Sequence, residues 1–384
     1  MSPRQDVASG APPTAAPLLD NLQVCRAFAA ITVVIGHALH DAGVVAAQRG
    51  AEAPGPDIDW TFGVDVFFVI SGFIMVHVSG KDFTRPGAAW QFLRRRLVRI
   101  VPLYWTLTTI MLAVGLLLPQ LLAIPVGSPS YVVSSYLFIP EWRVGAPVPE
   151  IRPLLALGWT LNYEMLFYVA LAGVMFLPVK RAIATLTALF ATAVTARFAL
   201  EIQQTQLMFW SDPIILEFLL GCYLALARQA GWRLPAPAAL LLGAAGITGL
   251  LLNSGSAAEL RPLLVGLPAL LLVAAAALGP TLPGGLPTRF ATLLGDASYA
   301  LYLSHPLVIR IQREVWLKLA DPAWPLWLYA LLCVVAASLA AIPIYLLFER
   351  PVTRLLQGKT HDRLEAAKGL AAGPPQAAAA STGR

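Results

Sequence analysis

Ionisable side chains inside long apolar segments are the residues of this chain whose types and spacing suit chemistry. Arg26 and His37 both lie in the apolar segment 22–43. Because each residue of an α-helix turns by about 100°, a spacing of eleven residues puts both side chains on one helix face, about 16 Å apart along the axis. A neutral imidazole in a low-dielectric environment suits general-base catalysis. In the structural alternative, the arginine extends toward water and the histidine bonds a neighbouring helix.

Two further ionisable residues, Glu164 and His305, occur within apolar segments. Glu164 ends the sequence Gly-Trp-Thr-Leu-Asn-Tyr-Glu, and a buried carboxylate needs a partner such as a histidine or an arginine of another helix. His305 ends the stretch Ser-Tyr-Ala-Leu-Tyr-Leu-Ser-His, which begins at Ser298. A lone histidine is commonly a structural group, but here it is the second such histidine in a chain with only five. Glu164 and His305 are therefore candidates for catalysis.

Four arginines in six residues precede and enter the apolar segment 97–119: Arg94, Arg95, Arg96 and Arg99. Basic residues at such a boundary are typical of topology signals or of contacts with lipid phosphates. Guanidinium groups also bind phosphates through paired hydrogen bonds, so the same cluster suits a polyanionic cofactor such as coenzyme A. Both interpretations remain open at this stage.

The apolar segment 61–79 contains Asp65, Ser71 and Gly72. Ser71 and Gly72 are small enough to let another helix or a ligand approach closely. Asp65 is either an acid that contacts an acceptor substrate or a charge near the surface. No oxyanion-binding motif is evident in the sequence. Ser71 and Trp159 are hypothetical hydrogen-bond donors to an oxyanion that develops during a reaction.

The elements that must position these residues are long apolar helices. The chain is 58% hydrophobic and only 12% charged, with a mean hydropathy of +0.69, whereas a soluble domain carries about 25% charged residues. Apolar runs long enough to cross about 30 Å of hydrocarbon recur along it. We predict an all-α, polytopic integral membrane protein with about ten transmembrane helices. The expected spans are 22–43, 61–79, 97–119, 153–177, 182–200, 207–227, 237–253, 261–279, 290–310 and 324–348.

The distribution of positive charge predicts the orientation. Most of the 27 lysines and arginines fall on one side if the N-terminus is cytoplasmic, and cytoplasmic loops are enriched in these residues. We expect a multi-pass protein of the inner (cytoplasmic) membrane with both termini in the cytoplasm. The net charge of +6 follows from this topology and indicates no nucleic-acid partner. Residues 20–357 form the expected transmembrane domain, between a disordered leader, 1–19, and a disordered tail, 358–384.

Several motifs in order, between about residues 21 and 356, resemble the membrane-bound acyltransferase-3 family. The resemblance is strongest to its exopolysaccharide O-acetyltransferase branch. One departure is Asn162-Tyr163, where many relatives have serine and another small or apolar residue. The matching elements are Arg26 with His37, Ser71-Gly72-Phe73, Arg96 with Arg99, Trp159 through Glu164, Tyr299 through His305, and Phe348-Glu349-Arg350-Pro351.

The resemblance implies transfer of an acyl group, most simply acetyl, from acyl-CoA to a hydroxyl of an exported glycan or a lipid-linked sugar. Arg26 and the arginine cluster would hold the donor, while Asp65, Ser71 and Trp159 would contact substrate. His37 would take the acceptor's proton, Glu164 would orient the imidazole, and His305 would act at the acceptor side. We expect the lipid bilayer as a partner and no metal. No particular protein partner is indicated.

Two other classes of function compete with an enzyme. A proton-coupled transporter or flippase would use Arg26, His37 and Glu164 as a proton or substrate path, but the paired repeats common in such folds are not evident. A non-catalytic scaffold would leave the buried ionisable residues unexplained. For an enzyme, a cytoplasmic donor and an outer acceptor leave two routes: either the thioester reaches into the membrane, or His37 or His305 carries a transient acyl group.

Overall fold

The regular secondary structure of this chain is helical. The computed structural model describes residues 16–55, 58–118, 125–146, 148–253, 255, 260–321 and 323–358. Among these residues the only β pairing is one isolated bridge, Trp142 with Ile151, so the predicted all-α class is confirmed. Residues 1–15 and 359–384, which include most of the expected disordered leader and tail, lie outside the described residues.

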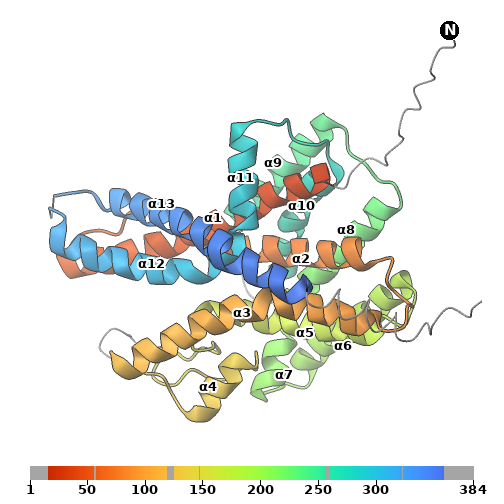
Figure 1. Ribbon diagram of the computed structural model, residues 1–384, viewed down its shortest axis with the longest axis horizontal. Helices are drawn as coiled ribbons and strands as arrows, with labels where there is room; N and C mark the ends of the chain where they lie inside the picture. Colours follow the sequence, from red (N-terminus) through yellow and green to blue (C-terminus); the bar gives the residue numbers. More distant parts are fainter. Residues whose placement is uncertain are drawn as a thin grey trace, which may run out of the picture.

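The helices follow one another in chain order, and Figure 1 labels the α-helices among them. They are α1 (Ala16–Arg49), η1 (Trp60–Phe62), α2 (Gly63–Ser79), α3 (Ala88–Leu117), α4 (Pro129–Tyr136), η3 (Ala156–Gly158), α5 (Trp159–Val174), α6 (Val179–Ala199), α7 (Thr205–Trp210), η4 (Pro213–Ile215), α8 (Leu216–Gln229), α9 (Ala236–Leu252), η6 (Pro262–Gly266), α10 (Leu267–Leu278), α11 (Leu286–Asp296), α12 (Ser298–Leu319), α13 (Leu326–Ile344) and η7 (Tyr345–Glu349).

Five helical segments of the described chain are long and apolar enough to cross a membrane, which makes this a multi-pass membrane protein. Two shorter apolar helices occupy 236–252 and 262–278. The predicted count of about ten spans is not confirmed. The five candidate spans are Asp20–Arg49, Trp60–Ser79, Ala88–Leu117, Val179–Ala199 and Leu326–Gly358.

Two of the expected spans are broken by local structure. Within 207–227, the Asp212 carboxylate accepts a hydrogen bond from the Ile214 amide and Pro213 begins a new short helix, so α7 and α8 are separate. Within 290–310, the break falls after Asp296, where α11 ends and α12 begins. Pro306 lies inside α12 without ending it, although it removes one backbone donor from the helix.

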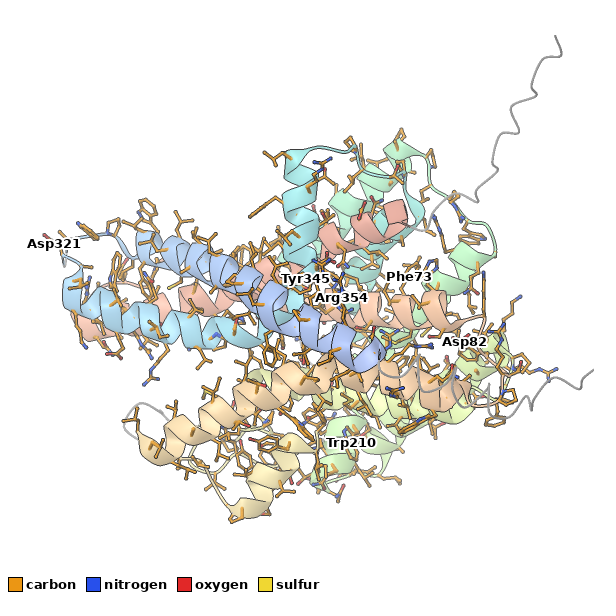
Figure 2. All side chains as sticks on the ribbon, in the orientation of Figure 1. Phe73, Asp82, Trp210, Asp321, Tyr345 and Arg354 are labelled. Atoms are coloured by element: carbon orange, nitrogen blue, oxygen red, sulfur yellow. The ribbon has the colours of Figure 1, made fainter. Side chains whose placement is uncertain are left out.

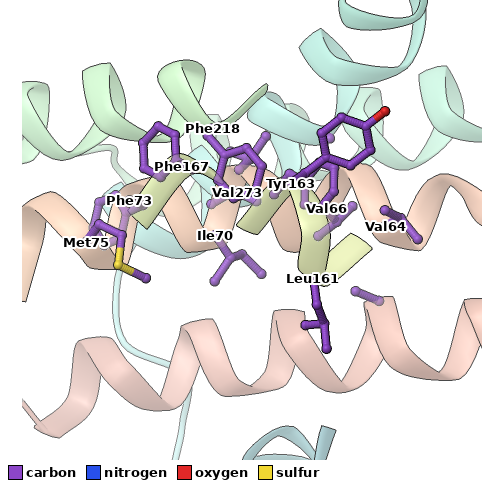
Figure 3. Packing of buried hydrophobic residues seen from close by; sticks show 14 of the residues in the cluster. Val64, Val66, Ile70, Phe73, Met75, Leu161, Tyr163, Phe167, Phe218 and Val273 are labelled. Carbon is purple, nitrogen blue, oxygen red and sulfur yellow. The ribbon is translucent and has the colours of Figure 1, made fainter. Parts of the chain in front are cut away.

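The centre of the protein is built on α2, which packs closely against α8. A Cβ atom at Gly72 would lie 1.9 Å from the carbonyl oxygen of Phe218, and one at Gly221 would lie 2.0 Å from that of Val69. Only glycine permits this backbone approach. Figure 3 shows the aromatic packing beside it, in which the Phe218 ring stacks 4.7 Å from the ring of Phe167.

Around this centre, α1, α12 and α13 run side by side on one flank, and α3, α5 and α6 lie on another (Figure 1). Asp321 lies in the turn between α12 and α13, and Asp82 lies between α2 and α3. Figure 2 shows these two acids at opposite ends of the long axis of the molecule. The helices that carry the candidate residues therefore extend along this axis.

Candidate active site

A cavity lies where α1, α2, α3, α5 and α12 meet. Its empty volume is about 820 Å³, including the open solvent that it reaches. One part of its wall is apolar and comes mainly from α2, with Phe67, Ile70, Ile74 and Met75 among the residues. The polar part combines residues of all five helices: Arg26, Ser71, Arg96, Arg99, Thr160, Glu164, Tyr168, Ser298, Tyr299 and Tyr302.

The three cavity arginines, Arg26, Arg96 and Arg99, are partly buried and make no side-chain hydrogen bond or ion pair with any described residue. The Nε atom of Arg96 is buried without a partner. Carboxylates act electrostatically on Arg26 from beyond ion-pair distance, notably Glu349 and Asp296. Each guanidinium has five N–H donors, so the cavity presents many unused donors for an anion.

The two other arginines of the cluster lie outside the cavity lining. Arg94 donates to the backbone carbonyl of Leu356 at 3.2 Å, and Arg95 pairs with Asp82 at 3.1 Å. The sequence predicted that these four arginines act together. In the structure, two of them line the cavity, and the other two contact protein groups outside it.

Glu164 joins two neighbours across the cavity wall. Its Oε1 atom accepts a hydrogen bond from the Ser71 hydroxyl at 3.3 Å and another from the Tyr168 hydroxyl. The sequence suggested a histidine or an arginine of another helix as the partner of this carboxylate. His37 and His305 bond backbone carbonyls instead, and no arginine among the described residues forms an ion pair with Glu164. Glu164 and Ser71 thus hold α5 and α2 in register beside the arginines.

His37 and His305 come together although they lie far apart in the sequence. The ring centres of His37 and His305 are 5.0 Å apart in an edge contact. Nδ1 of His37 bonds the carbonyl oxygen of Val33 at 2.9 Å, and Nδ1 of His305 bonds that of Leu301 at 3.0 Å. Because a carbonyl only accepts, each Nδ1 carries a proton, and the neutral ring presents its lone pair at Nε2.

His305 is fully buried, and its Nε2 atom has no hydrogen-bond partner among the described residues. Neither histidine lines the cavity itself. The connection is Tyr302, which does line it, and whose ring centre is 6.3 Å from that of His305. The arginines and the histidine pair are thus joined by the cavity and one layer of side chains.

Asp65 occupies a different place from the cavity. It is fully buried and forms a paired interaction with Arg261, with N–O distances of 2.8 and 2.7 Å. Buried Glu217 lies beside this pair. This arrangement fits a structural ion pair that joins α2 to the start of η6, and the sequence could not reveal the partner, because Arg261 lies 196 residues away.

Trp159 also lies outside the cavity lining. The guanidinium of Arg152 lies 5.8 Å from the centre of its ring, and the ring makes an edge contact with Tyr163. Thr160, the next residue, lines the cavity instead. Sequence reasoning passed over Thr160, Tyr168, Ser298 and Tyr302, although each lies within or close to a motif that it had quoted.

Comparison with known proteins identifies the family. A family model described as an acyltransferase domain, Acyl_transf_3, matches residues 19–346. The chain belongs to the acyltransferase-3 family. The resemblance found in the sequence is therefore confirmed over nearly the whole described chain.

Two curated proteins are similar to this acyltransferase. The exopolysaccharide production protein ExoZ of Rhizobium meliloti (strain 1021) is 34% identical over 298 residues, which cover 76% of this chain and 89% of the relative. Acyltransferase MdmB of Streptomyces mycarofaciens is 31% identical over 324 residues, which cover 76% of this chain and 79% of that protein. No solved structure matches this chain significantly.

The family motifs of this acyltransferase divide into two groups in space. Arg26, Ser71, Arg96, Arg99 and Glu164 line the cavity. His37 and His305 form the pair beyond Tyr302. In the described part of the chain, no group of three or more His, Cys, Asp or Glu side chains could hold a metal ion. An arginine-lined cavity and a histidine pair therefore lie on either side of Tyr302.

Proposed function

We propose that this protein transfers an acetyl group from acetyl-CoA to a hydroxyl of an exported or cell-surface glycan. The observation that carries the proposal is the convergence of Arg26, Arg96 and Arg99 on one cavity, where no described residue accepts a hydrogen bond from their guanidinium N–H groups. Acyl-CoA is the acyl donor that carries several phosphates, and guanidinium groups bind phosphate through paired, charge-assisted hydrogen bonds.

The donor would enter at the arginine end, with its phosphates on Arg96 and Arg99 and a deeper part near Arg26. The apolar face of α2, including Ile70 and Ile74, offers a surface for the pantetheine arm. The thioester would then reach the part of the cavity beside Thr160 and Tyr302. This geometry favours direct transfer within the membrane over transport of an acyl group by an enzyme residue.

His37 would act as the general base. A sugar hydroxyl has a pKa far above 7, so attack on a thioester needs a positioned group that takes the proton. The Nδ1–H bond to Val33 leaves the Nε2 lone pair of His37 free for this role. His305, whose Nε2 is buried without a partner, would assist on the acceptor side.

The acceptor class is supported by one relative's name, which refers to exopolysaccharide production. We propose an inner-membrane protein with both termini in the cytoplasm, so that the donor enters from the cytoplasm and the glycan from outside. The segments 44–60 and 120–152, which are described only in part and contain the end of α1 and all of α4, would select the acceptor. Arg152 and Trp159 belong to this side and offer a charge and an aromatic ring.

The test is acetyl transfer by purified protein in lipid nanodiscs. The donor is acetyl-CoA labelled in the acetyl group, and the acceptor is chemically de-O-acetylated polysaccharide from the producing cells. Wild-type protein is expected to give alkali-labile label on the polysaccharide, and His37→Ala should lower the rate at least about a hundredfold, the contribution typical of a general base. His40→Ala, an exposed histidine of the same helix, is the matched control.

Retained binding of CoA by His37→Ala would show that the variant is folded. Wild-type protein that neither binds CoA nor transfers acetyl would contradict the proposal and favour the transporter interpretation. Label trapped on the protein in a single turnover, at a rate that matches transfer, would replace direct attack with an acyl-enzyme.

A further inference from the structure

Two hydroxyl-bearing residues line the cavity close to the histidine pair. Thr160, in the first turn of α5, and Tyr302, on α12, both line the cavity, and each is only 6% exposed. The Thr160 hydroxyl lies 3.1 Å from the Tyr302 hydroxyl and can donate to it. The Tyr302 ring makes edge contacts with Phe67, at 6.1 Å between centres, and with His305.

Both hydroxyls share one acceptor within the protein. Thr160 lies 3.1 Å from the carbonyl oxygen of Leu157, and Tyr302 lies 3.3 Å from the same oxygen. The Tyr302 bond is long for an O–H donor. Tyr302 can therefore redirect its proton to a new oxygen while it still accepts from Thr160, and such a chain of hydroxyls strengthens the terminal donor.

The histidines cannot supply this donor in their neutral form. Nδ1 of each ring is committed to a backbone carbonyl, and Nε2 presents a lone pair. An acyl transfer creates negative charge on the carbonyl oxygen, and an active site stabilises that charge with hydrogen-bond donors fixed beforehand. A donor that is not an imidazole is therefore needed close to the histidine pair.

We propose that the Tyr302 hydroxyl, supported by Thr160, donates the hydrogen bond that stabilises the acyl-carbonyl oxygen during transfer. This inference rests on the proposed function. The acceptor oxygen forms a bond to the acyl carbon while its proton passes to Nε2 of His37, and the carbonyl oxygen gains charge against the Tyr302 hydroxyl. The carbon–sulfur bond then breaks, and the thiolate takes the proton from His37, which leaves an ester and free CoA.

The first test compares Tyr302→Phe with wild type in the nanodisc assay. Phenylalanine keeps the ring contacts and removes only the hydroxyl, so kcat is expected to fall about 10²- to 10³-fold, as for loss of one oxyanion donor. The KM for acetyl-CoA and the Kd for CoA should stay within about twofold. Tyr104→Phe is the matched control, because it removes an equally buried hydroxyl that donates to the carbonyl of Ser135, outside the cavity.

Thr160 tests the supporting hydroxyl. Thr160→Val keeps the shape and should lower kcat about tenfold, while Thr160→Ser, which retains the hydroxyl, should regain most of the rate. A structural role predicts similar losses of thermal stability and rate in both variants. Equal kcat values for Thr160→Val and Thr160→Ser would remove Thr160 from the proposal.

A spectroscopic measurement separates polarisation of the carbonyl from packing. His37→Ala protein is loaded with acetyl-CoA that carries a ¹³C-labelled carbonyl, and the infrared stretch of that carbonyl is recorded. It should shift to lower frequency than in free acetyl-CoA, and Tyr302→Phe in the same background should return it toward the free value. An unchanged frequency would overturn the inference, as would full activity of Tyr302→Phe. Absence of acetyl transfer by wild type would overturn the proposed function itself.

Discussion

Arg94, Arg95, Arg96 and Arg99 have the same side chain, yet their surroundings give them different roles. Arg96 and Arg99 are three residues apart on α3, a spacing that puts both on one helix face, and this face lines the cavity. Arg95 pairs with Asp82 near the surface instead. We therefore propose that the cofactor interpretation applies to Arg96 and Arg99, and the topology interpretation to Arg94 and Arg95.

Substitution of the cavity arginines should weaken donor binding selectively. Arg96→Gln and Arg99→Gln each remove charge-assisted hydrogen bonds worth about 1.5–3 kcal/mol, so the Kd for CoA should rise about ten- to a hundredfold. Binding of labelled CoA to nanodisc-embedded protein measures this change. Arg95→Gln is the control and should bind CoA almost as wild type. If Arg95→Gln weakened binding as much as Arg96→Gln, all four arginines would have to contact the donor.

At the scale of elements, α2 uses neighbouring residues for different purposes. Gly72 meets the backbone of α8, and Ser71 faces the cavity and bonds Glu164. Two turns earlier, Asp65 joins the helix to Arg261. Because successive residues of a helix point about 100° apart, one short segment contacts α8, the cavity and η6 together.

A methyl group at Gly72 should disrupt the α2–α8 contact. In Gly72→Ala the added Cβ atom would lie 1.9 Å from a backbone oxygen of α8, so the helices must separate, at a cost of about 1–3 kcal/mol. Thermal unfolding in detergent should show a lower midpoint. Gly173→Ala in α5 is the control, because a Cβ atom there meets nothing within 4 Å. Equal midpoints for both variants would contradict the close packing.

The buried Asp65–Arg261 pair should matter to stability more than to donor binding. Arg261→Met leaves the Asp65 carboxylate buried without its partner, and breaking such a pair costs about 3–5 kcal/mol. Asp65→Leu combined with Arg261→Met should recover part of the loss, which chemical denaturation in detergent would measure. Arg85→Met, which breaks an exposed pair with Asp82, should change stability little. A normal stability of Arg261→Met with lost acceptor transfer would return Asp65 to a substrate role.

At the scale of the whole molecule, the site has a direction. The arginines line the cavity, Tyr302 also lines it, and the Tyr302 ring contacts His305 of the histidine pair. A site that extends through the protein suits an enzyme whose donor and acceptor come from different sides of a membrane. The two substrates can meet within it, and neither has to cross the membrane completely.

Cysteine labelling would test the proposed orientation. The natural cysteines Cys25, Cys222 and Cys333 are buried and free, and they are first replaced by alanine. A membrane-impermeant maleimide should then label Asp321→Cys in cells whose outer envelope is permeabilised and whose inner membrane is intact. It should label Lys81→Cys only after the cells are lysed. The opposite pattern would reverse the topology and place the arginine end of the cavity outside the cytoplasm.

The sequence by itself determined the all-helical class, the membrane character and most of the ionisable residues around the site. These follow from local properties, because a charged group inside an apolar segment is costly and therefore conspicuous.

The sequence did not determine the partners of those groups. The pairing of Glu164 with Ser71, of Asp65 with Arg261 and of His37 with His305 depends on how distant helices pack. The break at Asp212 likewise escapes hydropathy, since it depends on a helix cap within an apolar stretch. Only the tertiary structure separated the cavity from the histidine pair and put Tyr302 between them, because contacts across the bundle follow from packing of the whole chain.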